Sequence, residues 1–228
     1  MAAKTLDRLN EFLGERILVV PTEALTAIGV HAGFTDDPSV LERFVDLVRE
    51  KGRFVERDAA ESDPELLQPI PLGYFAHDGS LLLLRRREES RRHRMHDKYA
   101  IWAGGHVREL DLNDGDPLLA GLFREIREEL FVESLPTPQP VGLVLDTASP
   151  QSARHLGVVF RFDLANSDVA LSMDQREFRE TRGRSLSGRM LPKEDVVRHF
   201  DAMERWSQIL LSSHLHATDK EVLSQLIL

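Results

Sequence analysis

The stretch "REIREELFVES", residues 124–134, is the part of the chain that best indicates its fold. Four of its eleven positions are glutamates, and like charges this close on one helix repel each other. At 100° per residue, Glu125, Glu128 and Glu129 project from one side of the helix and border an apolar stripe. Carboxylates beside a buried stripe are costly unless something neutralises them. Oxygen ligands of this kind suit Mg²⁺ or Mn²⁺.

The residues upstream of this helix favour a ligand site over an ordinary charged surface. Glycines at 104–105 end an expected strand, and paired glycines allow a ligand or metal to approach the backbone closely. Asp116 followed by Pro117 is typical of a helix N-cap with proline at the first helical position. The alternative is a solvated helix face on which Arg124 and Glu128 form a salt bridge four residues apart.

With these residues in place, the chain resembles the Nudix hydrolase family. The family signature is a glycine, five residues, Glu, seven residues, then Arg-Glu-(apolar)-x-Glu-Glu-x-Gly-(apolar). Residues 124–132 fit every specified position except the glycine, where this chain has Phe131. Asp116 stands where the first Glu belongs, which puts Gly105 five residues too far upstream, so we interpret residues 108–114 as containing an insertion. The segments "LQPIPLGYF" and "KYAIWAGGHV" also resemble a bacterial subgroup described as predicted phosphoesterases.

The resemblance implies a divalent metal, Mg²⁺ or Mn²⁺, bound by the helix glutamates and by the carbonyl of the box glycine. On this chain those residues are Gly105, Glu125, Glu128 and Glu129. The metal would bridge diphosphate oxygens and orient an attacking water. Arg124 would pair with a ligand carboxylate and aim it. Arg124 and Glu125 are therefore counted among the catalytic residues.

A general base is expected from a later loop, as in some family members. The segment "SMDQREFRETRGRS", residues 172–185, offers several acids before an expected strand. We favour Glu177 or Glu180 as the catalytic base. The alternative for both is an exposed, charged loop.

Substrate contacts are expected from four residues outside the acidic helix. The stretch 85–98 is basic in an otherwise acidic chain, and Arg85 and Arg87 suit phosphate oxygens. A solvated hairpin edge is the alternative for this stretch. Trp102 would stack on a base, or else lie in the core, because alternate strand residues face inward. His106 follows the paired glycines and would face substrate, or else play a structural role.

The order of elements predicts an α+β fold, a Nudix-type α/β/α sandwich with a mixed β-sheet and a small N-terminal α/β extension. We expect an extension over residues 1–70 and a Nudix domain over residues 71–228. Asp78-Gly79 between apolar runs predicts a hairpin. Expected strands cover 16–21, 99–107, 140–148, 155–165 and 184–191, expected helices cover 38–51, 117–130 and 192–215, and 56–71 is expected to be irregular.

The predicted function is hydrolysis of a diphosphate bond in a nucleoside diphosphate linked to another group. The alternative is a non-catalytic protein of the same fold that binds a nucleotide or metabolite, which the departures from the signature favour. Isomerase chemistry on a diphosphate-bearing lipid precursor is a third possibility, but that family relies on a cysteine and this chain has none.

Composition narrows the partners and the compartment. A net charge of -9 argues against nucleic acid as a partner, and no apolar stretch is long enough to span a membrane. We expect a cytoplasmic protein that can form a homodimer. The helix that carries the glutamates is expected to run on for a residue or two, with Phe131 packed beneath the sheet, because a left-handed end would cost about 1–2 kcal/mol without glycine.

Overall fold

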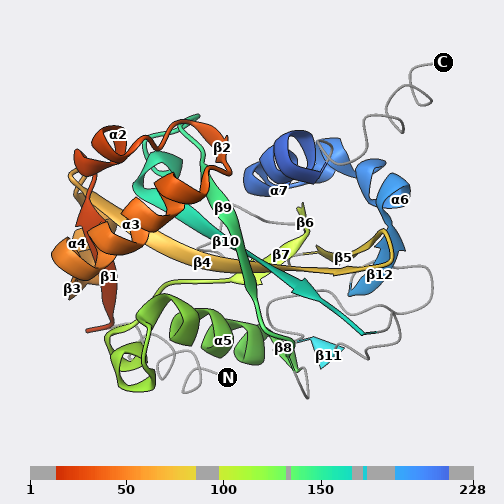
Figure 1. Ribbon diagram of the computed structural model, residues 1–228, viewed down its shortest axis with the longest axis horizontal. Helices are drawn as coiled ribbons and strands as arrows, with labels where there is room; N and C mark the ends of the chain where they lie inside the picture. The colour runs from red at the N-terminus through yellow and green to blue at the C-terminus, as the bar shows by residue number, and fades with distance from the viewer. Residues whose placement is uncertain (1–13, 86–97, 132–134, 166–171, 174–187, 216–228) are drawn as a thin grey trace, which may run out of the picture.

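The computed structural model describes residues 14–85, 98–131, 135–165, 172–173 and 188–215 (Figure 1). The strands are β1 (Arg16–Pro21), β2 (Gly33–Thr35), β3 (Arg53–Glu56), β4 (Leu66–His77), β5 (Ser80–Arg85), β6 (Tyr99–Ala100), β7 (Trp102–Gly104), β8 (Leu130–Phe131), β9 (Gln139–Leu145), β10 (His155–Asp163), β11 (Ser172–Met173) and β12 (Arg189–Pro192). The helices are α2 (Ala24–Ile28), α3 (Pro38–Lys51), α4 (Arg57–Ser62), η1 (Glu109–Asp114), α5 (Pro117–Glu129), η2 (Ser152–Arg154), α6 (Lys193–Val197), η3 (Phe200–Ala202), α7 (Arg205–Leu210) and η4 (Leu211–Leu215).

A mixed sheet organises the molecule, in the order β12-β5-β4-β10-β9-β2. Strands β4 and β10 run parallel, whereas the other neighbours along this path are antiparallel. Figure 1 shows α5 below the sheet and α7 above it. The predicted α+β class with a mixed sheet and helices on its faces is confirmed.

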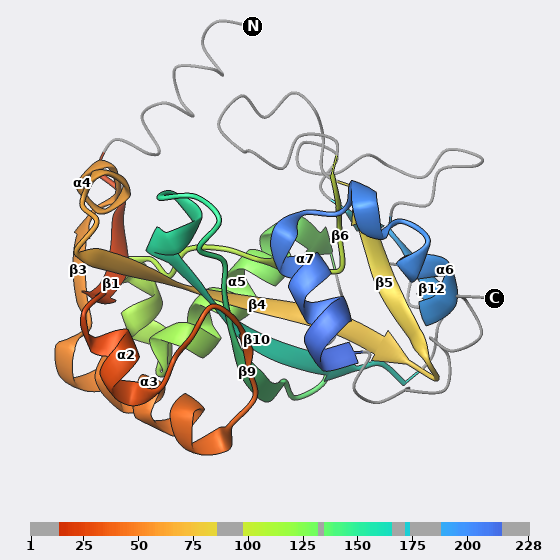
Figure 2. The ribbon, with the colours of Figure 1, turned by 90° about the horizontal axis from the view of Figure 1, so that it is seen from above.

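The long strand β4 is the centre of the sheet and changes partners along its length. It pairs with β1 at its start, with β10 and β7 in its middle, and with β5 at its end. Seen from above, α4 and β3 lie near one end of β4, and α6 and β12 lie near the other (Figure 2). The prediction that residues 56–71 are irregular is therefore wrong: α4 and the first half of β4 occupy them. The prolines and acids of this segment disfavour a strand locally, but its pairing with β10 stabilises one.

The hairpin turn lies where the sequence predicts it, and α3 covers its expected residues. Asp78 and Gly79 have φ angles of 43° and 75° and join β4 to β5, so the predicted hairpin is confirmed. Asp37 caps α3 by accepting a hydrogen bond from Ser39 N at 2.8 Å. Helix α3 ends before Gly52, as its sequence predicts.

The expected long helix over 192–215 is wrong, because the short helices α6, η3, α7 and η4 share these residues and the backbone is extended at Met203 and Glu204. Glu204 interrupts it: this carboxylate accepts hydrogen bonds from Trp206 N and Ser207 N and so begins α7. Helix α6 packs on β12 and β5, whereas α7 packs on β9 and β2. The strands expected over 140–148 and 155–165 are confirmed as β9 and β10, and β12 accounts for the described part of 184–191.

Strands of the N-terminal segment pair with strands of the rest of the chain. Strand β1 pairs with β3 and β4, and β2 pairs with β9. The boundary between residues 70 and 71 stays a prediction, and β4 runs across it. Within the described residues, no helix is long and apolar enough to cross a membrane.

Candidate metal and active site

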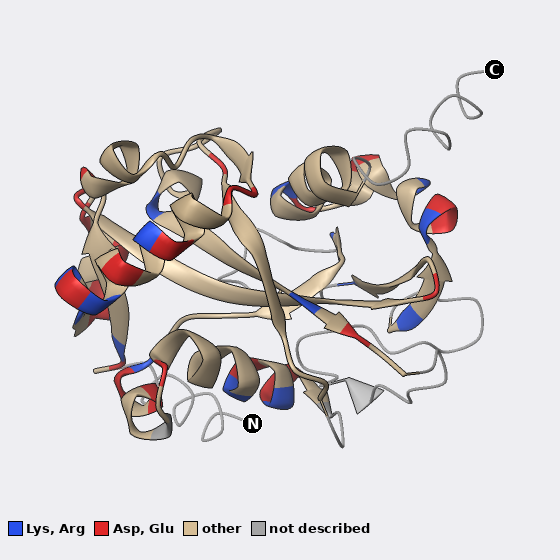
Figure 3. Ribbon diagram, in the orientation of Figure 1, with Lys and Arg blue, Asp and Glu red and all other residues tan. Residues whose placement is uncertain are grey.

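Helix α5 presents the three glutamates at the edge of its buried face. Leu118, Leu122 and Ile126 are buried against the sheet. The C-terminal half of the helix carries both acidic and basic residues (Figure 3). Glu125 and Glu129 are mostly buried, and the Glu128 side chain is 49% exposed.

The paired glycines bring the backbone against two of these carboxylates. Gly104 N donates to Glu129 Oε2 at 3.2 Å. A Cβ atom added at Gly105 would lie 2.5 Å from Glu125 Cδ, so any side chain at this position would displace that carboxylate. Gly104 has a φ of 152°, and a Cβ there would lie 2.3 Å from Pro71 O. Both glycines are therefore required for close approach.

Arg124 is held in a network that the sequence analysis placed only in part. Its Nη1 lies 2.6 Å from Glu125 Oε1 and 3.6 Å from Glu128 Oε1. Its Nε and Nη2 donate to the two oxygens of Asp111, at 2.9 and 3.0 Å, and Nη2 also donates to His106 O at 2.8 Å. The guanidinium therefore links the acidic helix to the loop that follows the glycines.

Asp111 corrects the alignment of the signature. Residues 106–110 separate it from Gly105, which is the five-residue spacing of the family, and it is the acid bonded to Arg124. Asp116 caps α5 instead, accepting hydrogen bonds from Leu118 N and Leu119 N. The insertion consequently follows the acid rather than preceding it. The spacing from Gly105 identifies this acid in the sequence, whereas the spacing counted back from Arg124 points to Asp116.

Arg108 and Glu15 are further residues that the sequence analysis missed. Arg108 Nη2 lies 3.9 Å from Glu125 Oε1, and its Nη1 lies 3.7 Å from Glu128 Oε1. Its Nε lies 2.6 Å from Glu15 Oε1, and Glu15 directly precedes β1. No local pattern links residue 15 to residue 108, so only the fold reveals this contact.

The pKa values of Glu125 and Arg124 are both raised, for different reasons. Burial raises the pKa of Glu125, and the charges of Arg124 and Arg108 counteract this only in part. Burial would lower the pKa of Arg124, but its hydrogen bonds to Asp111 and the charge of Glu125 raise it overall. Arg124 is therefore a permanent cation within this group.

The donor set suits a hard dication, although its ligand atoms are not gathered at one point. Among the described residues, only Glu61, His106 and His155 form a group of three or more His or acid side chains whose ligand atoms lie within 4.8 Å of one another. Glu125 and Glu128 face arginines, and Glu129 faces Gly104. Binding a metal through the three glutamates thus requires the half-exposed Glu128 to turn.

The helix end differs from the expectation at Phe131. Leu130 is extended, with φ −127° and ψ 108°, and Leu130–Phe131 form β8, which pairs with β11. The predicted extension of the helix is therefore wrong. The chain avoids the left-handed region as expected, since Asp78 is the one non-glycine residue with positive φ among those described.

The remaining predicted site residues lie in different places. Trp102 is buried, packs on Trp206 at 5.5 Å and donates to Glu204 Oε1 at 2.8 Å, as its core alternative requires. Its stacking role stays a prediction. The Arg85 guanidinium lies 5.5 Å from the Tyr99 ring centre. Outside the described residues are Arg87, Glu177 and Glu180.

Comparison with known proteins identifies the family. No protein-family model matches the chain. The crystal structure of Tm1382, described as a Nudix hydrolase, has 30% sequence identity to this chain and superposes on it with a TM-score of 0.67. The match covers 89% of this chain and 100% of the Tm1382 chain. The chain belongs to the Nudix hydrolase family. Protein YmaB of Bacillus subtilis (strain 168) is a second relative of this Nudix protein, 25% identical over 209 residues that cover 87% of this chain and 97% of YmaB.

Proposed function

We propose that this Nudix protein hydrolyses a diphosphate bond in a nucleoside diphosphate linked to another group, with Mg²⁺ or Mn²⁺ as cofactor. The main support for this proposal is the set of three carboxylates on α5, two of which lie against the paired glycines. Family membership supports hydrolase chemistry, and the donor set supports the choice of metal. Carboxylate and carbonyl oxygens suit Mg²⁺ and Mn²⁺ better than they suit softer ions.

The residues proposed to hold the metal are Glu125, Glu128, Glu129 and the Gly105 carbonyl. When bound, the metal supplies charge withdrawal from the diphosphate oxygens and lowers the pKa of a coordinated water. Arg124 holds the Glu125 carboxylate against the glycine loop, so its proposed role is to aim that ligand.

The substrate contacts and the general base are proposed from the sequence. Arg85 and Arg87 would hold phosphate oxygens, and Trp102 or His106 would contact the rest of the substrate. Glu177 or Glu180 would accept the proton of the attacking water. A cytoplasmic location, a homodimer and the absence of a nucleic-acid partner also stay predictions.

A non-catalytic, ligand-binding Nudix protein is the second candidate, and one observation favours it. Arg108 and Arg124 already neutralise two of the three glutamates. A dication would compete with these arginines, which weakens its binding. The two candidates therefore differ in whether Mg²⁺ binds at useful concentrations.

Turnover of a substrate panel tests the proposal. We would assay the full chain with Mg²⁺ or Mn²⁺ against nucleoside diphosphate derivatives, beside Glu128→Gln and Glu42→Gln. Glu42 is an exposed helical glutamate of α3, so it controls for the loss of a surface charge. We expect metal-dependent turnover that Glu128→Gln lowers by at least about 100-fold and Glu42→Gln leaves unchanged. Tight nucleotide binding without turnover would instead establish the second candidate.

A further inference from the structure

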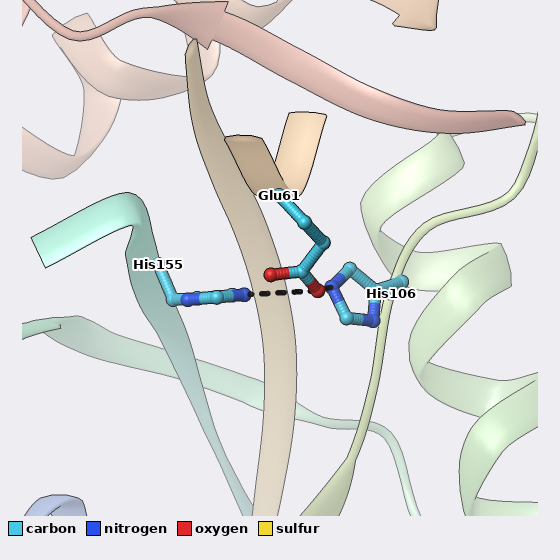
Figure 4. A group of neighbouring side chains, drawn as sticks. All are labelled: Glu61, His106 and His155. Atoms are coloured by element: carbon cyan, nitrogen blue, oxygen red, sulfur yellow. Dashed lines mark ion pairs between the residues drawn. The ribbon is translucent and has the colours of Figure 1, made fainter. Parts of the chain in front are cut away.

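Three side chains of types that can bind a metal, from distant parts of the chain, meet beside β4, outside the carboxylate set of α5. Glu61 belongs to α4, His106 follows β7, and His155 begins β10 (Figure 4). The Nε2 atoms of His106 and His155 lie 4.0 and 3.9 Å from Glu61 Oε1. The two imidazole rings are 5.6 Å apart, edge to face. All three donors thus converge on one point.

The ring of His155 is oriented as a metal ligand. Its Nδ1 lies 2.9 Å from Gln151 O, and a carbonyl only accepts, so Nδ1 carries the proton. The Nε2 lone pair then points to Glu61 (Figure 4). Metal-bound histidines typically donate their second ring nitrogen to a carbonyl or carboxylate in this way.

A buried amide lies beside the second histidine. Gln68 is fully buried, and its Nε2 donates to Ala60 O at 3.3 Å, which aims Oε1 at His106 Nε2 at 2.8 Å. An ion bound through His106 Nε2 would displace the proton shared with this amide. The amide oxygen would then be free to become a fourth ligand.

Two arginines contact Glu61. Arg154 donates to its backbone carbonyl, which ties α4 to η2, the turn before His155. Arg57 Nε lies 3.9 Å from Glu61 Oε1, but its Nη1 also pairs with Glu15 Oε2 at 2.9 Å. Arg57 therefore keeps a carboxylate partner if Glu61 turns to a metal.

We propose that Glu61, His106 and His155 form a binding site for one transition-metal dication of the Zn²⁺ class. Two imidazoles and one carboxylate suit Zn²⁺, whereas the oxygen set on α5 suits Mg²⁺. Tetrahedral ligands at Zn²⁺ bond lengths lie about 3.4 Å apart, so the two distances from Glu61 to the histidines, 3.9 and 4.0 Å, must shorten by roughly half an ångström. All three ligand atoms already lie within 4.8 Å of one another. Gln68 Oε1 or water completes the shell.

Zinc binding to the full chain tests this site directly. We would measure stoichiometry by equilibrium dialysis, the ligand-field spectrum of the Co²⁺ form, and the melting temperature with Zn²⁺. The parent should bind one Zn²⁺ and melt about 5–10 °C higher at a hundredfold excess over Kd. His155→Ala and Glu61→Gln should each weaken binding by at least about 100-fold, because loss of an outer partner alone costs about 10–100-fold.

Two control variants distinguish this site from a surface histidine and from the carboxylates of α5. His31 is exposed and lies outside the cluster, so His31→Ala should bind Zn²⁺ like the parent. Glu128→Gln should also retain Zn²⁺ binding, which separates this site from the proposed Mg²⁺ site. Glu61 is 40% exposed, so Glu61→Gln tests the site even if His155→Ala does not fold. Parent-like Zn²⁺ binding by both site variants, or none by the parent, overturns the proposal.

Discussion

Replacement of Gly105 by alanine tests the contact between the glycine loop and the acidic helix. The new Cβ would lie 2.5 Å from Glu125 Cδ and 2.7 and 2.8 Å from its oxygens. Ordinary contact begins near 3.4 Å, so the carboxylate must move by about 0.6–0.9 Å. Arg124 holds this carboxylate at 2.6 Å, which opposes the movement. A misplacement near 1 Å costs on the order of 100-fold in rate, so we expect that loss for Gly105→Ala.

The assay pairs two readouts with a matched glycine. Metal-dependent turnover and Mn²⁺ affinity should both fall, whereas the melting temperature should change little because Gly105 is not left-handed. Gly79→Ala strains a hairpin residue with φ 75° and open space around its Cβ, so it should lower the melting temperature and leave Mn²⁺ affinity unchanged. Parent-like Mn²⁺ affinity and rate in Gly105→Ala would refute the steric reasoning.

Three further predictions concern stability, each measured by denaturant or thermal unfolding. Asp111→Ala should lower the free energy of unfolding by about 3 kcal/mol, because Arg124 is buried and loses one of its carboxylate partners. A loss smaller than that of Asp116→Ala would contradict this prediction. Asp116→Ala removes the N-cap of α5 and should cost about 1 kcal/mol; no loss would mean that the cap is not stabilising. Burial lowers the pKa of His214, whose Nε2 lies 3.0 Å from Tyr74 Oη. The unfolded chain binds this proton more tightly, so its stabilising contribution is present above about pH 6.5 and lost as pH falls through the folded pKa. His214→Asn should flatten the acid side of the stability curve, and an unchanged slope would refute this assignment.

The sequence predicts an element correctly where residues within that element determine its structure. The Asp78-Gly79 turn, the Asp37 cap and the amphipathic helix from Pro117 each follow from adjacent residues. Local signals failed where distant segments decide the outcome. The prolines of β4 hide a strand that β10 stabilises, and Glu204 breaks a helix whose periodicity continues past it.

The candidate site shows the same division. The three glutamates and the glycine were predictable because the family signature places them on one helix and one turn. The contact between Glu15 and Arg108 and the meeting of Glu61 with His155 span about 90 residues, so no spacing rule reveals them. The position of the insertion was open to a count in either direction, and only the bond between Asp111 and Arg124 decides it.

The four residues 112–115 lie between two anchored carboxylates. Asp111 is fixed by Arg124 before the insertion, and Asp116 is fixed by the first turn of α5 after it. Leu112, which lies between these anchors on η1, is more than half exposed. Chain length can therefore vary between the two anchors without moving the glycines or the glutamates. This segment is a natural position for a genetically encoded tag or a grafted recognition loop that leaves the chemistry in place.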